Sequence, residues 1–203
     1  MKKIMVVALC GIACATQQGF AADDFGIESA SPVSIADPVN PQPGMILKAY
    51  NLQYSYSSQQ AVSRLKEGAV KLPSLPAAKT VVDKNEDFSM RQFGKSGLNA
   101  GLWSGFLKCK RAGVYTLNLM QNCDIPFGGY SLRINGKPVL PVGEKLTSVD
   151  VELKVGWNKF DLVGMFFRQA PLTITYKPKE SLSEPRALTP GMLFFDKKIE
   201  EEW

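Results

Sequence analysis

The side chains that most often carry out chemistry in proteins are scarce in this sequence. The 203 residues contain no histidine. Histidine is the general base of Ser-His-Asp and Cys-His catalysis and a frequent ligand of zinc, so these triads and all histidine-ligated metal sites are excluded. An enzyme built on this chain would depend on carboxylate, lysine, tyrosine or cysteine chemistry. The composition therefore favours binding over catalysis.

The acidic residues suggest no reaction centre. Asp83, Glu86 and Asp87 form a cluster in the sequence, which we interpret as part of a solvated loop. A glycosidase needs two carboxyl groups roughly 5–10 Å apart beside a cleft. Since no such pair stands out, a two-carboxylate hydrolase is less favoured than a binding function, and we expect no enzymatic activity.

The cysteines leave two alternatives open. Cys109 and Cys123 are the two that lie outside the N-terminal segment, and two cysteines in an oxidising compartment usually pair. The bond would stabilise the fold by about 3 kcal/mol in the chain-entropy model. However, a tight hairpin of residues 103–109 and 114–121 would separate the thiols by roughly 30 Å, too far for a bond. Either the hairpin bends or the thiols stay apart.

The N-terminus has the layout of a secretory signal. Two lysines precede an apolar run over residues 4–15, and a small-residue site follows around Gly19-Phe20-Ala21, with Gly19 and Ala21 at the two positions that the peptidase reads. The run is shorter than the roughly 20 residues that span a bilayer. We expect cleavage after Ala21, with cleavage after Ala15 and lipidation of Cys14 as alternatives. The protein is thus expected to be secreted, periplasmic or at the cell surface, without a transmembrane anchor.

The mature chain is expected to hold one folded domain between two irregular segments. Removal of residues 1–21 leaves 22 basic and 19 acidic residues, a net charge of +3, which is too mild to indicate nucleic-acid binding. Residues 22–43 are rich in Pro, Ser and Asp and are interpreted as a flexible leader. The domain itself occupies 44–195, and 196–203 form a charged tail that ends in Trp203.

The hydrophobic pattern of the domain is mainly that of β-strands. A first strand is expected over 45–54, then a short helix from Ser57 or Ser58 to about Gly68. A minor strand at 81–82 and a loop over 83–100 follow. Alternating segments with glycine-rich turns between them then continue to residue 176, namely 102–109, 114–120, 130–134, 137–142, 149–155, 159–167 and 172–176.

Two turns have clear signals in this region. Asn135-Gly136 is typical of a two-residue hairpin turn, because both residues tolerate positive φ. Gly156-Trp157-Asn158 is expected to form another turn. Short strands at this spacing indicate a sandwich or a barrel.

The order of these features resembles the PA14 family, the β-sandwich module named for the protective antigen of anthrax toxin. The resemblance covers about residues 44–195 and implies an all-β, PA14-like antiparallel β-sandwich of the jelly-roll type with one short helix. It depends on GMILKAYNL at 44–52, WSGFL at 103–107, AGVYTL at 112–117, LRINGKPV at 132–139, the Gly156-Trp157 turn, and Leu188-Thr189-Pro190 through Leu193-Phe194.

The resemblance implies carbohydrate recognition or adhesion. In glycan-binding members of the family, two adjacent aspartates in the loop after the glycine-tyrosine strand hold a calcium ion. The corresponding loop here, 121–129, has the single carboxylate Asp124 beside Asn122. Because calcium requires six to eight oxygen ligands, we expect no cofactor, with calcium at Asp124 as the alternative. A plain surface loop in which these two side chains cap their own backbone is also open.

A sugar site without calcium would combine such polar groups with an aromatic ring. Phe127, Tyr130 and Trp157 are the candidates, although Trp157 is also suited to closing the end of the sandwich. Trp103 and Tyr115, together with Leu117, are expected to share the inner face and to pack in the core.

Two functions fit these observations. The first is a non-catalytic binding module for glycan recognition or adhesion at the cell envelope or surface. The alternative is a protein-interaction or structural subunit of a pilus, toxin or secretion assembly, whose partner is another envelope protein. In that case the leader 22–43 would add as a strand to the partner's sheet.

Overall fold

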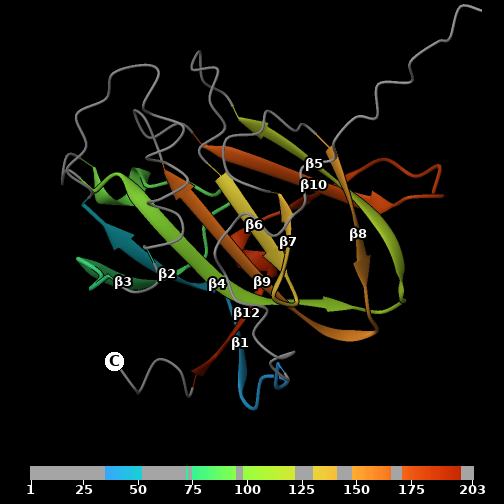
Figure 1. The fold of residues 1–203 in the computed structure, drawn as a ribbon, viewed down its shortest axis with the longest axis horizontal. Helices are drawn as coiled ribbons and strands as arrows, with labels where there is room; N and C mark the ends of the chain where they lie inside the picture. Colours follow the sequence, from blue (N-terminus) through green and yellow to red (C-terminus); the bar gives the residue numbers. More distant parts are fainter. Residues whose placement is uncertain are drawn as a thin grey trace, which may run out of the picture. The chain divides into compact units, whose positions relative to one another are not determined.

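The computed structural model describes residues 35–51, 72, 75–94, 98–121, 130–140, 148–165 and 171–197. Their strands form two antiparallel sheets (Figure 1). Within these ranges the helical elements are short 3-10 turns, among them η2 (Arg91–Phe93) and η3 (Pro190–Met192). The helix expected after Ser57 lies outside the described residues. The predicted all-β sandwich is confirmed.

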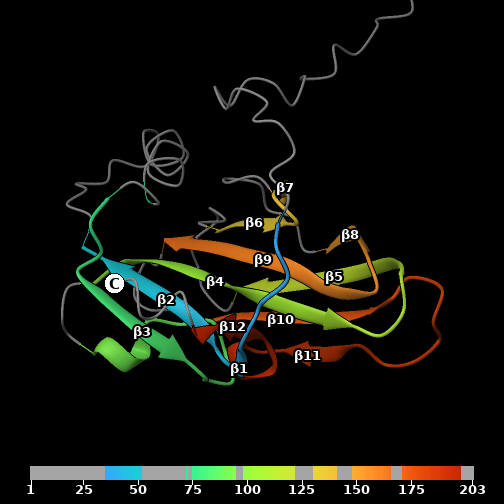
Figure 2. The same ribbon diagram turned by 90° about the horizontal axis from the view of Figure 1, so that it is seen from below.

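The larger sheet, here sheet A, has the order β1-β12-β4-β9-β6-β7, with β2 beside β4 and β3 beside β2. The smaller sheet, sheet B, has the order β11-β10-β5-β8. In Figure 2, β9 and β6 of sheet A lie above β10 and β11 of sheet B. The strands are β1 Pro41–Pro43, β2 Met45–Tyr50, β3 Lys79–Asp83, β4 Ala100–Cys109, β5 Gly113–Gln121, β6 Tyr130–Ile134, β7 Lys137–Leu140, β8 Ser148–Leu153, β9 Gly156–Met165, β10 Leu172–Pro178, β11 Arg186–Leu188 and β12 Phe194–Asp196.

The core contains the inward-facing residues of both sheets. Trp103 of β4 and Tyr115 and Leu117 of β5 are buried in the same apolar cluster, which confirms the prediction that they pack together. Phe88 lies between two of the large rings, edge-on to Trp103 at 6.0 Å and stacked on Phe160 at 6.1 Å. Each of these rings is fully buried, and buried aromatic rings contribute strongly to the stability of a core.

One acidic residue of the sequence cluster belongs to this core, which corrects the interpretation of a solvated loop. Asp83 is fully buried at the end of β3. Its carboxylate accepts hydrogen bonds from Trp103 Nε1 at 2.6 Å and from the backbone N–H of Asn85 at 3.1 Å. A buried indole N–H needs an acceptor, which explains why a carboxylate lies there. Burial raises the pKa of Asp83 above its ordinary value.

The expected tight hairpin of 103–109 and 114–121 is wrong. β4 belongs to sheet A, whereas β5 pairs with β8 and β10 in sheet B. Both strands direct a row of apolar side chains into the core, for example Leu107 from β4 and Leu117 from β5. These two rows of side chains pack against each other because the strands lie in opposite sheets. The separation calculated for the two thiols therefore does not apply. Cys109 is a buried thiol, and its pairing with Cys123, which lies outside the described residues, stays a prediction.

One of the two predicted turns is confirmed and the other is displaced. Asn135 and Gly136 have φ values of 52° and 78°, as a two-residue hairpin turn between β6 and β7 requires. The Gly156-Trp157-Asn158 turn is wrong, because β9 begins at Gly156. The Asn158 amide donates to the Lys154 carbonyl at 2.8 Å, and its oxygen accepts from the Lys154 N–H at 3.0 Å. These bonds place the chain reversal before Gly156.

The leader contributes a strand to the domain. Residues 41–43 form β1, which pairs with β12 at the edge of sheet A, where its two prolines are tolerated. The Asp196 carboxylate also accepts the backbone N–H groups of Val39 at 2.8 Å and Asn40 at 3.3 Å. The compact unit accordingly begins at Ile35, and 41–43 cannot extend another protein's sheet while they pair with β12. No helix among the described residues is long and apolar enough to cross a membrane.

Candidate functional site

The strands on either side of the loop 122–129 meet at one end of the sandwich. β5 ends at Gln121, opposite Leu172, where β10 begins. β6 begins at Tyr130, opposite Gly164, near the end of β9. The loop therefore connects sheet B to sheet A at this end, which we call the loop end. β2 also ends there, and β4 begins there.

The candidate residues from the sequence have different locations. Asn122, Asp124 and Phe127 lie outside the described residues. Tyr130 faces inward from β6, alternates with polar residues as Leu132 does, and is 4% exposed. Its ring is part of the core and offers no open face for a sugar, which corrects its assignment as a ligand-binding aromatic. Within the described ranges, no group of three acidic or cysteine side chains is arranged to hold a metal ion.

Trp157 lies on the outer face of sheet A, half-buried, rather than in a turn at the end of the sandwich. It packs edge-to-face with Phe194 of β12, at 5.2 Å between ring centroids, and with Phe106 of β4, at 6.4 Å. The ammonium group of Lys108 lies 4.9 Å from the Trp157 ring centroid, within the range of a cation–π interaction. We call Phe106, Trp157 and Phe194 the aromatic cluster.

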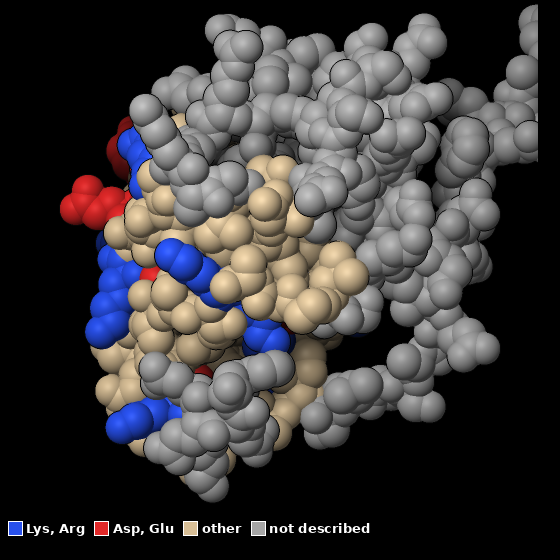
Figure 3. All heavy atoms as spheres, turned by 90° about the vertical axis from the view of Figure 1, so that its left-hand side faces the viewer, with Lys and Arg blue, Asp and Glu red and all other residues tan. Residues whose placement is uncertain are grey.

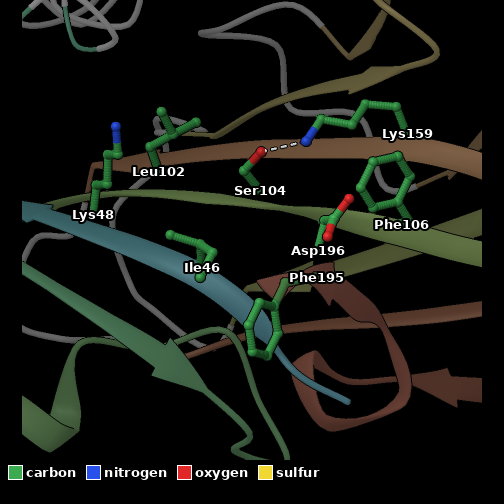
Figure 4. A pocket seen from close by; sticks show the side chains of 9 residues that line it. Ile46, Lys48, Leu102, Ser104, Phe106, Lys159, Phe195 and Asp196 are labelled. Atoms are coloured by element: carbon green, nitrogen blue, oxygen red, sulfur yellow. Dashed lines mark hydrogen bonds between the residues drawn. The ribbon is translucent and has the colours of Figure 1, made fainter. Parts of the chain in front are cut away.

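A groove of about 110 Å³ opens on the same face beside the aromatic cluster (Figure 4). It lies where β4 changes its neighbour, since Ser104 pairs with Ile46 of β2 whereas Phe106 pairs with Phe194 of β12. A Cβ on Gly105 would lie 2.8 Å from the Phe194 carbonyl oxygen, so the close approach of β12 requires glycine. The groove is lined by Ile46, Lys48, Leu102, Ser104, Gly105, Phe106, Lys159, Phe195 and Asp196.

The polar side chains at the groove form a connected network across β4 and β9. Lys159 Nζ donates to Ser104 Oγ at 2.6 Å, and Ser104 in turn donates to Asp161 Oδ1 at 2.6 Å. Lys159 Nζ also lies 3.5 Å from Asp161 Oδ1 and 4.8 Å from the Phe106 ring centroid. Sequence reasoning missed this network, although the alternation of residues 104, 106 and 108 on one face of an expected strand was a usable signal.

Ser104 and Lys159 are the residue types that a Ser-Lys dyad would use. A Ser-Lys dyad needs a neutral lysine that removes the serine proton. Here Lys159 Nζ donates to Ser104 Oγ and pairs with Asp161, and the serine hydroxyl donates to Asp161. The groove therefore presents fixed hydrogen-bonding groups between apolar walls.

In the view of Figure 3, lysine and arginine side chains are separated by neutral residues, in keeping with the formal net charge of +5 for the whole chain. At the groove, burial lowers the pKa of Lys48 below its ordinary value.

Comparison with known proteins identifies the fold. No protein-family model and no curated protein matches the sequence. Among solved structures, the chain is similar to the PA14 domain of the antifreeze protein MpAFP, with a TM-score of 0.54 and 16% identity over 79% of this chain and 95% of that one. It is also similar to the A domain of epithelial adhesin 9 from Candida glabrata, solved in complex with Galβ1-3GlcNAc, with a TM-score of 0.53 and 11% identity over 78% and 94% of the two chains.

An anti-sigma factor domain-containing protein matches with a TM-score of 0.50 and 14% identity, over 76% of this chain and 48% of that one, so the chain spans about half of its length. The chain is thus a two-layer antiparallel β-sandwich. More specifically it has the PA14 fold, as the order of its sequence features predicted.

Proposed function

We propose that this chain is an exported, non-catalytic glycan-binding module that acts in recognition or adhesion at the cell envelope or surface. The observation that carries the proposal is the position of the loop 122–129. It leaves sheet B at Gln121 and enters sheet A at Tyr130, so it connects two rigid strands at the loop end. Loops held by such a scaffold are frequent binding sites.

The residue types in this loop suit sugar hydroxyl groups. The Asp124 carboxylate accepts hydrogen bonds, and the Asn122 amide both donates and accepts, so together they match the donor and acceptor character of a hydroxyl pair. Phe127 supplies an aromatic face for the apolar side of a pyranose. The adhesin structure in complex with Galβ1-3GlcNAc supports β-galactosides as the first ligands to examine.

The proposed site does not require calcium. With one carboxylate in the loop, most of the six to eight oxygen ligands of a calcium ion would have to come from amides, carbonyls and water. We therefore expect glycan binding to persist when calcium is removed.

A glycan array tests the proposal. The mature protein from Ala22 onward is applied with calcium and, in parallel, with EDTA. Asp124→Asn and Phe127→Ala are expected to lose most of the signal in both buffers. Glu152→Gln, an exposed acid on the outer face of sheet B, is the matched control and is expected to bind as the unaltered protein does.

Each outcome of the array is informative. Binding that disappears in EDTA supports the glycan function but replaces our site by a calcium site at Asp124. Binding that is unchanged in both loop variants places the ligand elsewhere on the domain. The absence of binding on a broad array contradicts the proposal and favours the role of a protein-interaction subunit.

A further inference from the structure

Two neighbouring connections bring basic side chains together at the end of the sandwich opposite the loop end. β4 ends at Cys109, opposite Gly156, where β9 begins, and β5 begins at Gly113, opposite Leu153, where β8 ends. The β4–β5 and β8–β9 connections therefore lie side by side, at the right-hand end of Figures 1 and 2. The basic side chains in and beside these connections are all exposed, and we call them the basic corner: Lys108, Lys110, Arg111 and Lys154.

The positive charges of the basic corner are available to a partner. In the described part of the chain, no ion pair joins the basic side chains of residues 108–111 to an acidic side chain. Lys108 instead lies over the Trp157 ring, 4.9 Å from its centroid. Lys154 Nζ lies 4.0 Å from Asp37 Oδ1, and because these side chains are 54% and 66% exposed, their pair contributes little. The anionic groups of a partner can therefore reach all four cations.

Hydrogen bonds hold the backbone of both connections in place. The Tyr115 hydroxyl donates to the Arg111 carbonyl at 3.0 Å. In the other connection, the buried Asn158 side chain bonds to both the N–H and the carbonyl of Lys154. Gly156 then adopts a φ of 87°, which favours glycine, and completes the chain reversal. Because the backbone is already ordered, binding through these connections loses little conformational entropy.

The basic corner is suited to a flat partner. Its side chains belong to turns and strand ends, and none of them lines the groove on sheet A. Val155 is 63% exposed between Lys154 and Gly156, and the half-buried Trp157 follows. Basic side chains next to exposed aliphatic and tryptophan residues are typical of protein surfaces that contact lipid headgroups. A negatively charged bilayer offers a plane of phosphate groups that all the cations can reach together.

The acidic residues at this end do not cancel the basic corner. Glu152, exposed opposite Val114, and Asp37 are the acids beside it, and its four cations outnumber them. Farther along sheet B, equal numbers of basic and acidic side chains balance one another, namely Lys177, Lys179 and Arg186 against Asp150, Glu180 and Glu184. The surface formed by the two connections is therefore positive.

We propose that the basic corner docks the domain on an anionic lipid bilayer, with its four cations against the headgroup phosphates and Val155 among the headgroups. The proposal goes beyond glycan binding and does not depend on it. Gln121 and Tyr130, which flank the loop 122–129, lie at the opposite end of the sandwich. A domain docked by the basic corner therefore keeps these two residues away from the bilayer.

Co-sedimentation with lipid vesicles tests the proposal. The mature protein from Ala22 onward is mixed with vesicles of phosphatidylcholine alone, or of phosphatidylcholine and phosphatidylglycerol. We expect it to bind the anionic vesicles, more weakly as the salt concentration rises, and not to bind the neutral ones. Lys110→Gln, Arg111→Gln and Lys154→Gln are each expected to lower the partition coefficient roughly fivefold, the effect of removing one basic side chain from a charged membrane surface.

Matched variants make the result specific to the basic corner. Lys79→Gln removes an exposed positive charge near the loop end, opposite Ala49, and is expected to leave the partition coefficient unchanged. Glu152→Gln removes the acid beside the corner and is expected to strengthen binding. Val155→Trp is also expected to strengthen it, because tryptophan favours the membrane interface. Met120→Trp, at a position that is also 63% exposed but lies near the loop end, is expected to have no effect. Thermal unfolding checks that every variant is folded.

The outcomes separate this inference from the proposed function. Failure to bind the anionic vesicles, equal binding to both kinds of vesicle, or unchanged binding by all three corner variants overturns the inference. So does a Val155→Trp variant that binds no better than Met120→Trp. If the soluble polyanion heparin binds through the corner and vesicles do not, the corner belongs to an acidic polymer and the inference is also overturned. Since the vesicles carry no glycan, vesicle binding together with silence on the glycan array refutes the proposed function alone.

Discussion

Replacement of Asn158 by alanine is expected to cost about 3 kcal/mol of folding free energy. The Asn158 side chain is fully buried. It makes three hydrogen bonds of ordinary length, to the Lys154 carbonyl at 2.8 Å, from the Asn135 amide at 2.9 Å and from the Lys154 N–H at 3.0 Å. Each contributes about 1 kcal/mol net, and alanine replaces none of them. The variant would also free the β8–β9 connection from the turn between β6 and β7.

Unfolding in guanidinium chloride, followed by tryptophan fluorescence, measures this cost. For a domain of this size about 3 kcal/mol corresponds to a fall of roughly 6–12 °C in Tm. Asn118→Ala, on the outward face of β5, is the control and is expected to change stability by less than about 0.5 kcal/mol. A loss below about 1 kcal/mol for Asn158→Ala would refute the reasoning, since water would then satisfy the groups that the amide joins.

Three further predictions concern other positions. Gly105→Ala is expected to cost about 1–3 kcal/mol, measured by chemical unfolding, because its Cβ would lie 2.8 Å from the Phe194 carbonyl oxygen and force β12 away from β4. Asp196→Ala should loosen residues 35–40, so limited proteolysis is expected to cleave there first, whereas equal protection in both proteins would contradict the role given to this carboxylate. Because burial raises the pKa of Asp83, the folded protein holds this proton more tightly than the unfolded chain, and the contribution of Asp83 to stability falls as the pH rises from its ordinary value of 3.8 through the folded value. Asp83→Asn should lack that fall. Its stability relative to the unaltered protein should therefore increase as the pH rises above the ordinary value of 3.8, in addition to a constant difference caused by the changed hydrogen bonds.

The parts of the fold that local sequence determines were predictable. Strand β6 was expected over 130–134 and has those bounds, because Tyr130, Leu132 and Ile134 alternate with polar residues. The Asn135-Gly136 turn was equally local, since few residue pairs adopt two consecutive positive φ values. The order of such elements was sufficient to recognise the PA14 fold.

Pairing between distant segments was not predictable in the same way. An alternating strand has the same pattern whether its neighbour in sequence lies beside it or in the opposite sheet, which is why β4 and β5 were taken for a hairpin. Asparagine is common in turns, which is why Asn158 was expected to lie in one. Asn158 instead lies in β9, and its side chain hydrogen-bonds to the backbone of Lys154 in the connection between β8 and β9. The groove forms because β4 pairs with β2 up to Ser104 and with β12 at Phe106. No local sequence signal specifies this change of pairing partner.

The described chain enters the domain at the end opposite the loop end. The Ile35 side chain lies against the β6–β7 turn, 3.8 Å from the position that a Cβ of Gly136 would take. β6 runs from the loop end at Tyr130 to this turn, so the chain enters at the opposite end. Gln121 and Tyr130, the two described residues that flank the loop 122–129, therefore lie at the far end of the domain from Ile35.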